Sequence, residues 1–147
     1  MSQQTPATPG VVMTARTAPG FHCTLKHDPS GTTASTEAPK DNGGTGMSFS
    51  PTDLVGAALA SCALTTMALA ASRENIPFGD AHARVEKRMT GAPRRIGELV
   101  VEIDMPTGLS AAHRTRLEEV VHGCPVSRSL HPDVKLPITF RYPDAPR

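Results

Sequence analysis

The longest apolar segment of the chain, residues 54–71, has eighteen residues and no charged side chain. Just before it, Ser50 and Pro51 are residue types favoured at the N-cap and at the first position of a helix, and Asp53 supplies an acid three residues after the cap. We therefore predict a helix that begins at Pro51 and ends near Glu74. A helix that is apolar on every side should be buried on every side, and one chain of 147 residues can hardly surround it alone. The pattern thus points to a partner subunit.

A membrane span is the main alternative for this segment, because eighteen apolar residues meet the length that a bilayer requires. Seven of the eighteen are Ala and three more are Ser or Thr, so the free energy gained by transfer into lipid is small. Asp53 and Pro77 also bound the segment closely. We therefore expect a core helix and no membrane partner.

Short strands are predicted before this helix. Residues 11–16 and 21–27 are two apolar-containing runs on either side of Pro19 and Gly20, a pair that signals a tight turn and therefore a hairpin. Most of the segment that follows should be loop, with one short strand near residues 32–37.

Two longer strands are predicted after the helix. Residues 81–89 and 99–105 alternate between apolar and polar side chains, and the loop at residues 91–95 joins them as a hairpin. One face of this hairpin should be buried and the other should face water. The predicted inward residues are Ala81, Ala83, Val85 and Met89 in the first strand, and Leu99, Val101, Ile103 and Met105 in the second.

The remaining elements are two helices and a strand. Ser110 is the predicted N-cap of a helix over residues 111–122. Cys124 and Pro125 then occupy the N-cap and first position of a new short helix, and residues 136–142 close the chain as a strand. Strands and helices that are grouped in this order indicate the α+β class.

The length of 147 residues suits one domain, and we expect a flexible tail over residues 1–10 followed by a single domain over residues 11–147. The formal net charge is +1, and the chain has four Phe, one Tyr and no Trp. Binding a nucleic acid requires an excess of positive charge or rings that stack on bases, so we expect no nucleic acid partner. The start of the chain lacks the charged and apolar regions of a signal peptide, which predicts a cytoplasmic protein.

Three cysteines carry the candidate chemistry. They are widely spaced, form no CxxC pair, and are accompanied by no histidine pair with ligand spacing, so we expect no metal and no cofactor. From the pattern alone, Cys62 in the long helix is interpreted as a small buried filler. Cys124 is either a cap or a reactive thiol, since the start of a helix favours the thiolate. Cys23 alternates with Phe21 and Leu25 on a strand and is interpreted as structural.

Two motifs resemble one known family. The first is Phe49-Ser-Pro-Thr-Asp-Leu-Val-Gly-Ala-Ala-Leu-Ala-Ser-Cys62, and the second is His122-Gly-Cys-Pro-Val-Ser-Arg-Ser-Leu130. Together they resemble the superfamily of osmotically inducible protein C (OsmC) and organic hydroperoxide resistance protein, over nearly the whole chain. The resemblance implies an α+β OsmC-like fold, with curved antiparallel sheets around a long buried central helix, in an intertwined homodimer.

The resemblance also implies a reaction, the thiol-dependent reduction of organic hydroperoxides. The substrate would be a small-molecule hydroperoxide, and an external dithiol would be the reductant. Carried onto this sequence, Cys62 attacks the peroxide and becomes a sulfenic acid, and Cys124 resolves it by forming a disulfide. On this basis Cys62 is a catalytic residue rather than a filler.

One position departs from the hydroperoxide-resistance branch. In that branch a glutamate follows the helix-starting proline and helps to hold a catalytic arginine, whereas this chain has Thr52 there and its acid at Asp53. Asp53 is therefore a candidate site residue as well as a cap. Because burial in an apolar helix disfavours a thiolate, we expect a guanidinium to reach Cys62 and to be held in place by Asp53 or another carboxylate. Arg16 and Arg128 are the nearest candidates, within the subunit or across a dimer interface.

The departure keeps a second function open. A protein of the same fold without catalytic activity could bind a small apolar ligand at the dimer interface.

Overall fold

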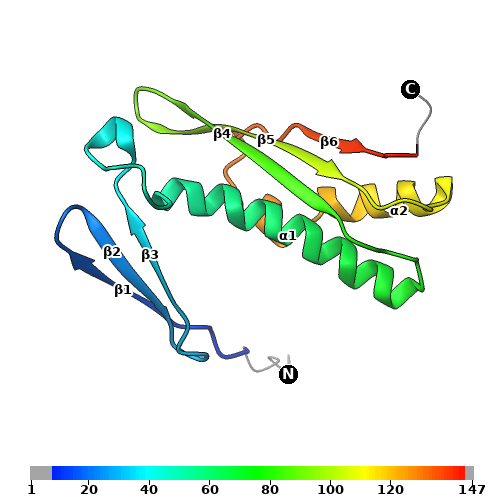
Figure 1. The fold of residues 1–147 in the computed structure, drawn as a ribbon, viewed down its shortest axis with the longest axis horizontal. Helices are drawn as coiled ribbons and strands as arrows, with labels where there is room; N and C mark the ends of the chain where they lie inside the picture. Colours follow the sequence, from blue (N-terminus) through cyan, green and yellow to red (C-terminus); the bar gives the residue numbers. More distant parts are fainter. Residues whose placement is uncertain (1–7, 145–147) are drawn as a thin grey trace, which may run out of the picture. The chain divides into compact units, whose positions relative to one another are not determined.

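The computed structural model describes residues 8–144 and divides into two compact units, Met1–Pro51 and Thr52–Arg147, which we call the first and second units (Figure 1). Most of the predicted tail over residues 1–10 lies outside the described residues. The single domain over residues 11–147 stays a prediction.

The first unit contains a three-stranded antiparallel sheet in the order β1-β2-β3. Gly20, at the turn between the first two strands, has a φ of 78°, in the left-handed region that glycine adopts without steric cost. The predicted hairpin and the predicted third strand are both confirmed. The bounds are β1 (Met13–Ala18), β2 (His22–His27) and β3 (Thr33–Glu37), and a 3-10 helix, η1 (Lys40–Asn42), follows them.

The loop after β3 is organised around the carboxylate of Glu37, which is fully buried. The Thr45 hydroxyl donates to it at 2.9 Å, and the backbone N–H groups of Thr45, Met47 and Ser48 donate as well. The Nε2 atom of His22 lies 3.7 Å from one carboxylate oxygen. Burial alone would raise the pKa of Glu37, but the hydrogen bonds outweigh it and hold the pKa below its ordinary value.

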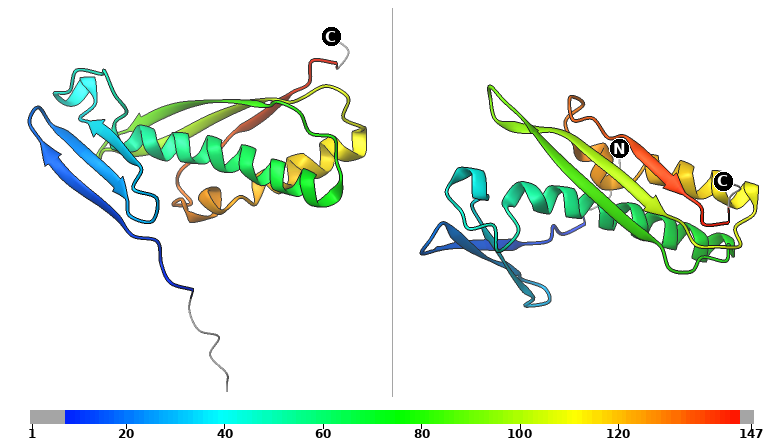
Figure 2. Two further views of the ribbon diagram at one scale, coloured as in Figure 1. Left: turned by 60° about the horizontal axis from the view of Figure 1, so that its bottom comes forward. Right: turned by 45° about the horizontal axis from the view of Figure 1, so that its top comes forward.

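The second unit has one three-stranded sheet, with α1 and α2 on the same side of it in both views of Figure 2. β4 and β5 form the predicted antiparallel hairpin, and β6 adds a strand parallel to β5, so this sheet is mixed. Parallel neighbours need a crossover connection, which α2 and α3 supply. The bounds are α1 (Pro51–Glu74), β4 (His82–Thr90), β5 (Arg95–Asp104), α2 (Ala111–His122), α3 (Pro125–Ser129) and β6 (Ile138–Arg141).

The core of the second unit lies between this sheet and the two longer helices. The predicted inward residues of β5 are confirmed, since Leu99, Val101 and Ile103 have no exposed surface. The opposite face carries charged pairs, among them Arg88 and Glu98 at 2.9 Å. The residues that the helices bring to the core are Leu59, Ala63, Met67 and Ala71 from α1, and Leu117 and Val121 from α2.

Within the single chain, α1 is buried on one face only, in line with the expectation that one chain can hardly surround it alone. The opposite face is exposed and consists almost entirely of small residues, with Leu69 as the large exception at 49% exposed. By length and composition α1 could cross a membrane, but a core helix passes the same test. We call the exposed set the small-residue stripe of α1: Ala57, Ala58, Ser61, Thr65, Ala68, Leu69 and Ser72.

The buried carboxylate of the first unit should make stability depend on pH. Because the pKa of Glu37 is lowered by folding, its contribution is complete above the ordinary carboxyl pKa of about 4.3 and is lost as the pH falls through the lowered value. Glu37→Gln should therefore lower the midpoint of urea unfolding at pH 7, and the difference from the unmodified chain should shrink near pH 3. Glu119→Gln, at an exposed position on α2, is the matched control. An equal difference at both pH values would contradict the lowered pKa.

Candidate functional site

The two cysteines singled out by the resemblance share one core, although they belong to different helical segments. The Cys62 thiol is one of the neighbours that lower the pKa of the Cys124 thiol. Cys124 has no exposed surface and belongs to the core, while Cys62 is half-buried and packs against the same core from α1. Both are free thiols. The structure therefore brings together two sulfur atoms at the centre of the second unit.

The junction between α2 and α3 places the Cys124 sulfur. Gly123 ends α2, where the Gly123 N–H donates to the Val120 carbonyl at 3.3 Å and the Cys124 N–H donates to the Val121 carbonyl at 3.2 Å. Cys124 then turns to an extended conformation, with φ of −65° and ψ of 147°, and Pro125 starts α3. This confirms the predicted N-cap position, but the Cys124 side chain makes no capping hydrogen bond, so its sulfur is available for other contacts.

Three neighbours stabilise a negative charge on the Cys124 sulfur. Burial by itself raises the pKa of the Cys124 thiol. Hydrogen bonds from the hydroxyl and N–H of Ser127, from the Cys62 thiol and from the N–H of Val126 lower it, and the net result is a pKa below the ordinary value.

Asp53, the third predicted site residue, lies beside a lysine. Lys87 Nζ is 2.6 Å from Asp53 Oδ1 and donates to the Thr52 hydroxyl at 2.8 Å. The lysine comes from β4, and only 16% of its side chain is exposed. Through its contacts with Asp53 and Thr52, Lys87 thus links the first turn of α1 to β4.

The sequence interpretation missed Lys87, although a signal for it was present. Strict alternation places position 87 on the inward face, between Val85 and Met89, where a charged residue requires a buried partner. Its cross-strand partner is Leu99, a fully buried residue. The ammonium reaches out of this apolar layer to the start of α1.

The two candidate arginines lie in different units. Arg128, in α3, donates its backbone N–H to the carbonyl oxygen of Cys124 at 3.1 Å. Its guanidinium lies over Gly123, since a Cβ at that glycine would be 3.1 Å from Arg128 Nη2. Arg16 lies on β1, opposite Thr24. An arginine that activates Cys62 stays a prediction.

Cys23 lies on β2, with Thr17 and Thr36 as its cross-strand neighbours. It belongs to the first unit and is half-buried. Among residues 8–144, no group of three or more His, Cys, Asp or Glu side chains is placed to hold a metal ion.

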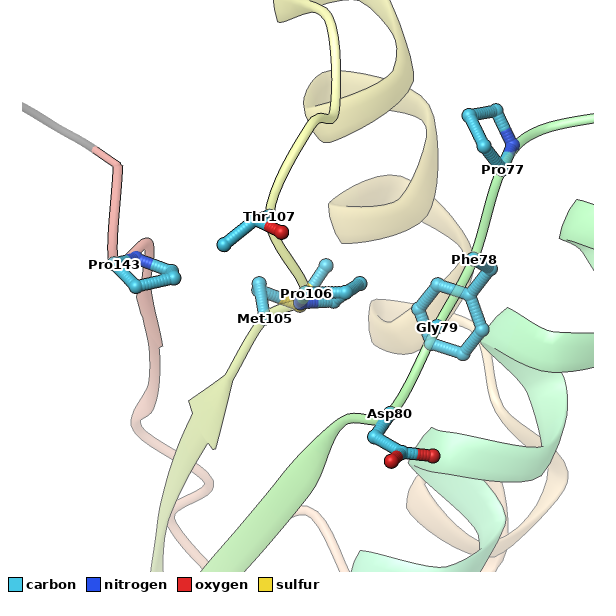
Figure 3. A pocket seen from close by; sticks show the side chains of 8 residues that line it. All are labelled: Pro77, Phe78, Gly79, Asp80, Met105, Pro106, Thr107 and Pro143. Carbon is cyan, nitrogen blue, oxygen red and sulfur yellow. The ribbon is translucent and has the colours of Figure 1, made fainter.

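A hollow of about 630 Å³ lies in the second unit (Figure 3). It is formed by the segment after α1, the segment after β5 and Pro143. Among the described residues, Asp80 is the one charged residue in its lining, and no cysteine lines it. Its lining residues are Pro77, Phe78, Gly79, Asp80, Met105, Pro106, Thr107 and Pro143.

Comparison with known proteins identifies the family. The model of the OsmC-like protein family matches residues 44–139, which is more than half of the chain and includes both Cys62 and Cys124. The chain belongs to the OsmC-like protein family. A comparison with curated protein sequences finds no match.

Solved structures of OsmC-like proteins have the same fold. A protein from Psychrobacter arcticus 273-4, described as an osmotic stress induced and detoxification response protein, is 29% identical, with a TM-score of 0.85 over 93% of this chain and 100% of that chain. An organic hydroperoxide resistance protein OsmC from Legionella pneumophila is 19% identical, with a TM-score of 0.72 over 91% and 98%. An organic hydroperoxide resistance protein from Elizabethkingia anophelis is 17% identical, with a TM-score of 0.75 over 94% and 99%. Several proteins of this fold are thus named for hydroperoxide resistance.

Mild oxidation should join the sulfurs of Cys62 and Cys124. Treatment of the folded protein with diamide should consume two of its three free thiols, and peptide mapping without reductant should find a Cys62–Cys124 disulfide. Cys23→Ser should leave this disulfide intact, whereas Cys62→Ser and Cys124→Ser should each prevent it. A disulfide that includes Cys23, or three thiols that all survive, would contradict this pairing.

Proposed function

We propose that this OsmC-like protein reduces organic hydroperoxides through a cycle in which Cys62 is oxidised and Cys124 resolves the product. The observation that carries the proposal is that Cys62 packs against the core that contains Cys124, which puts a nucleophile and its resolving partner in one site. The names of the Legionella and Elizabethkingia proteins of the same fold support the choice of substrate class.

Cys124 is the proposed acceptor for the proton of the nucleophile. Its neighbours, the Cys62 thiol among them, hold the pKa of the Cys124 thiol below its ordinary value. As Cys62 attacks the distal peroxide oxygen, its proton passes to Cys124. The O–O bond breaks, the alkoxide leaves and takes up a proton from solvent, and Cys62 becomes a sulfenic acid. An arginine near Cys62 would stabilise the negative charge on the leaving oxygen.

The second half of the cycle returns both thiols. The Cys124 sulfur attacks the sulfenic acid sulfur, water leaves, and a Cys62–Cys124 disulfide forms. An external dithiol then reduces this disulfide and is itself oxidised to a disulfide. The balance is one hydroperoxide and one dithiol converted to one alcohol, one water and one disulfide, with no metal or organic cofactor.

The proposal includes a homodimer, for which the small-residue stripe of α1 is the supporting feature. The stripe exposes alanine methyl groups and the short side chains of Ser and Thr, together with Leu69, on the side of α1 that faces away from the core. Small residues allow a second backbone to approach closely, and burial of the stripe would complete the burial of this helix. A second copy of the chain is the proposed occupant.

Dithiol-dependent consumption of an alkyl hydroperoxide by the purified protein tests the reaction. Cys62→Ser should reduce the rate to that of the uncatalysed reaction. Cys124→Ser should consume about one equivalent of hydroperoxide per chain and then stop, with a sulfenic acid that dimedone traps on Cys62. Cys23→Ser, the matched control, should retain full activity. If the unmodified protein consumes no hydroperoxide, the catalytic proposal is wrong and the ligand-binding alternative gains support.

The oligomeric state tests the role of the stripe. Light scattering should give twice the chain mass of 15.5 kDa. Thr65→Arg places a long charged side chain in the middle of the stripe and should shift the mass toward the monomer. Thr115→Arg, an exposed threonine on α2, should leave the dimer unchanged. A monomeric mass for the unmodified chain at micromolar concentration would contradict the dimer.

A further inference from the structure

Thr66 lies one helical turn after Cys62 in α1, and its hydroxyl contacts the Cys62 sulfur. The Cys62 Sγ and Thr66 Oγ1 atoms are 4.0 Å apart, and both residues are half-buried. Side chains in a helix lean toward its N-terminus, so a residue four positions later covers the preceding turn. Both residues belong to one helix of one chain. The contact therefore does not depend on how a second subunit covers α1.

Two other hydroxyl groups in the helices of this chain bond to the backbone. The Thr115 hydroxyl donates to the Ala111 carbonyl at 3.1 Å, and the Ser129 hydroxyl donates to the Pro125 carbonyl at 2.8 Å. Each acceptor lies four residues before its donor, where a hydroxyl in a helix commonly finds a partner. The contact of the Thr66 hydroxyl is with the side chain four residues before it. Thr66 is thus placed to act on a sulfur rather than on the backbone.

Negative charge on the sulfur strengthens this contact. A neutral thiol is a weak acceptor, and between the two neutral groups either atom can be the donor. A thiolate has no proton, so the hydroxyl must then donate, and hydrogen bonds to charged groups are shorter and roughly twice as strong as those between neutral groups. An interaction that strengthens as charge develops favours the transition state more than the resting thiol, and so it raises the rate.

We propose that Thr66 is a catalytic residue whose hydroxyl donates a hydrogen bond to the Cys62 sulfur as that sulfur loses its proton and attacks the hydroperoxide. The inference rests on the proposed function, because it concerns the nucleophile of that cycle. The Cys62 proton passes to Cys124, the S–O bond forms as the O–O bond breaks, and the Thr66 proton stays on its own oxygen. One turn before Cys62 the helix carries Ala58 and Leu59, which have no side-chain donor. The donor on α1 therefore comes from the turn that follows.

The ionisation of Cys62 can be measured without a reagent that must reach its sulfur. In a background with Cys23→Ser and Cys124→Ser, Cys62 is the one cysteine of the chain, and NMR of its isotope-labelled β-carbon follows thiolate formation. Thr66→Val removes the hydroxyl but keeps the shape of the side chain, and it should raise the pH midpoint by about half to one pH unit. Thr66→Ser keeps a hydroxyl and should reverse most of this shift. An unchanged midpoint in Thr66→Val would overturn the proposal.

Thr115→Val is the matched control, because Thr115 makes its contact four residues back with a backbone carbonyl on α2. It should leave the midpoint of Cys62 unchanged, and an equal shift in both valine variants would overturn the proposal. A second measurement needs no substitution at Thr66, so the proposal stays testable if Thr66→Val fails to fold. The NMR signal of the Thr66 methyl group should shift with the same pH midpoint as the Cys62 carbon. A methyl signal that does not move as Cys62 ionises would also overturn the proposal.

The titration separates the inference from the proposed function, because it uses no hydroperoxide. In the active protein, Thr66→Val should slow consumption of the first equivalent of hydroperoxide about two- to fourfold at neutral pH, since the loss of thiolate outweighs the greater nucleophilicity of a more basic thiolate. The difference should disappear at high pH, where Cys62 is ionised in both proteins. A chain that consumes no hydroperoxide but shows the shifted midpoint contradicts the proposed function alone. An active peroxidase in which Thr66→Val leaves rate and midpoint unchanged contradicts the inference alone.

Discussion

The close approach of α1 to the sheet of the second unit is the constraint on which the site depends. Gly56 lies where a Cβ would be 3.4 Å from a side-chain atom of Val85 and 3.6 Å from one of Leu99, so the helix contacts the sheet with little space to spare. The buried face of α1 continues through small and flexible residues such as Ala63 and Met67. Because protein interiors are close-packed, the packing of α1 on the sheet determines where Cys62 lies relative to the junction of α2 and α3. The position of Cys62 against the core that contains Cys124 follows from the packing of the helix.

Local signals in the sequence were sufficient for most elements of the fold. The Ser110 hydroxyl accepts from the His113 N–H at 3.1 Å, as expected of an N-cap, and α2 begins at the next residue. The strict alternation around Val101 placed the inward face of β5 correctly, because the period of a strand allows only two faces. The parallel pairing of β5 with β6 had no comparable local signal, since it depends on how the intervening helices return the chain.

Local sequence signals predicted the residues of the candidate site less well. The pattern alone favoured a structural filler at Cys62, and only the resemblance brought it together with Cys124. Glu37 was missed because its burial is produced by a loop that wraps around its carboxylate through Thr45 and neighbouring N–H groups. Such contacts join residues whose spacing follows neither the helix nor the strand period, so the hydrophobic pattern does not indicate them.

The pairing of Lys87 with Asp53 has a consequence for how this sequence can vary. The start of a helix carries the positive end of its dipole, so a lysine beside it is unfavourable unless an acid lies between them. Asp53 supplies that acid, and it occupies the same turn as Thr52, the position where the hydroperoxide-resistance branch carries its glutamate. A relative that loses the acid at this turn would place the lysine ammonium beside the positive end of the helix dipole without the carboxylate of position 53. Positions 53 and 87 should therefore change together among relatives, with a neutral residue at one accompanied by a neutral residue at the other.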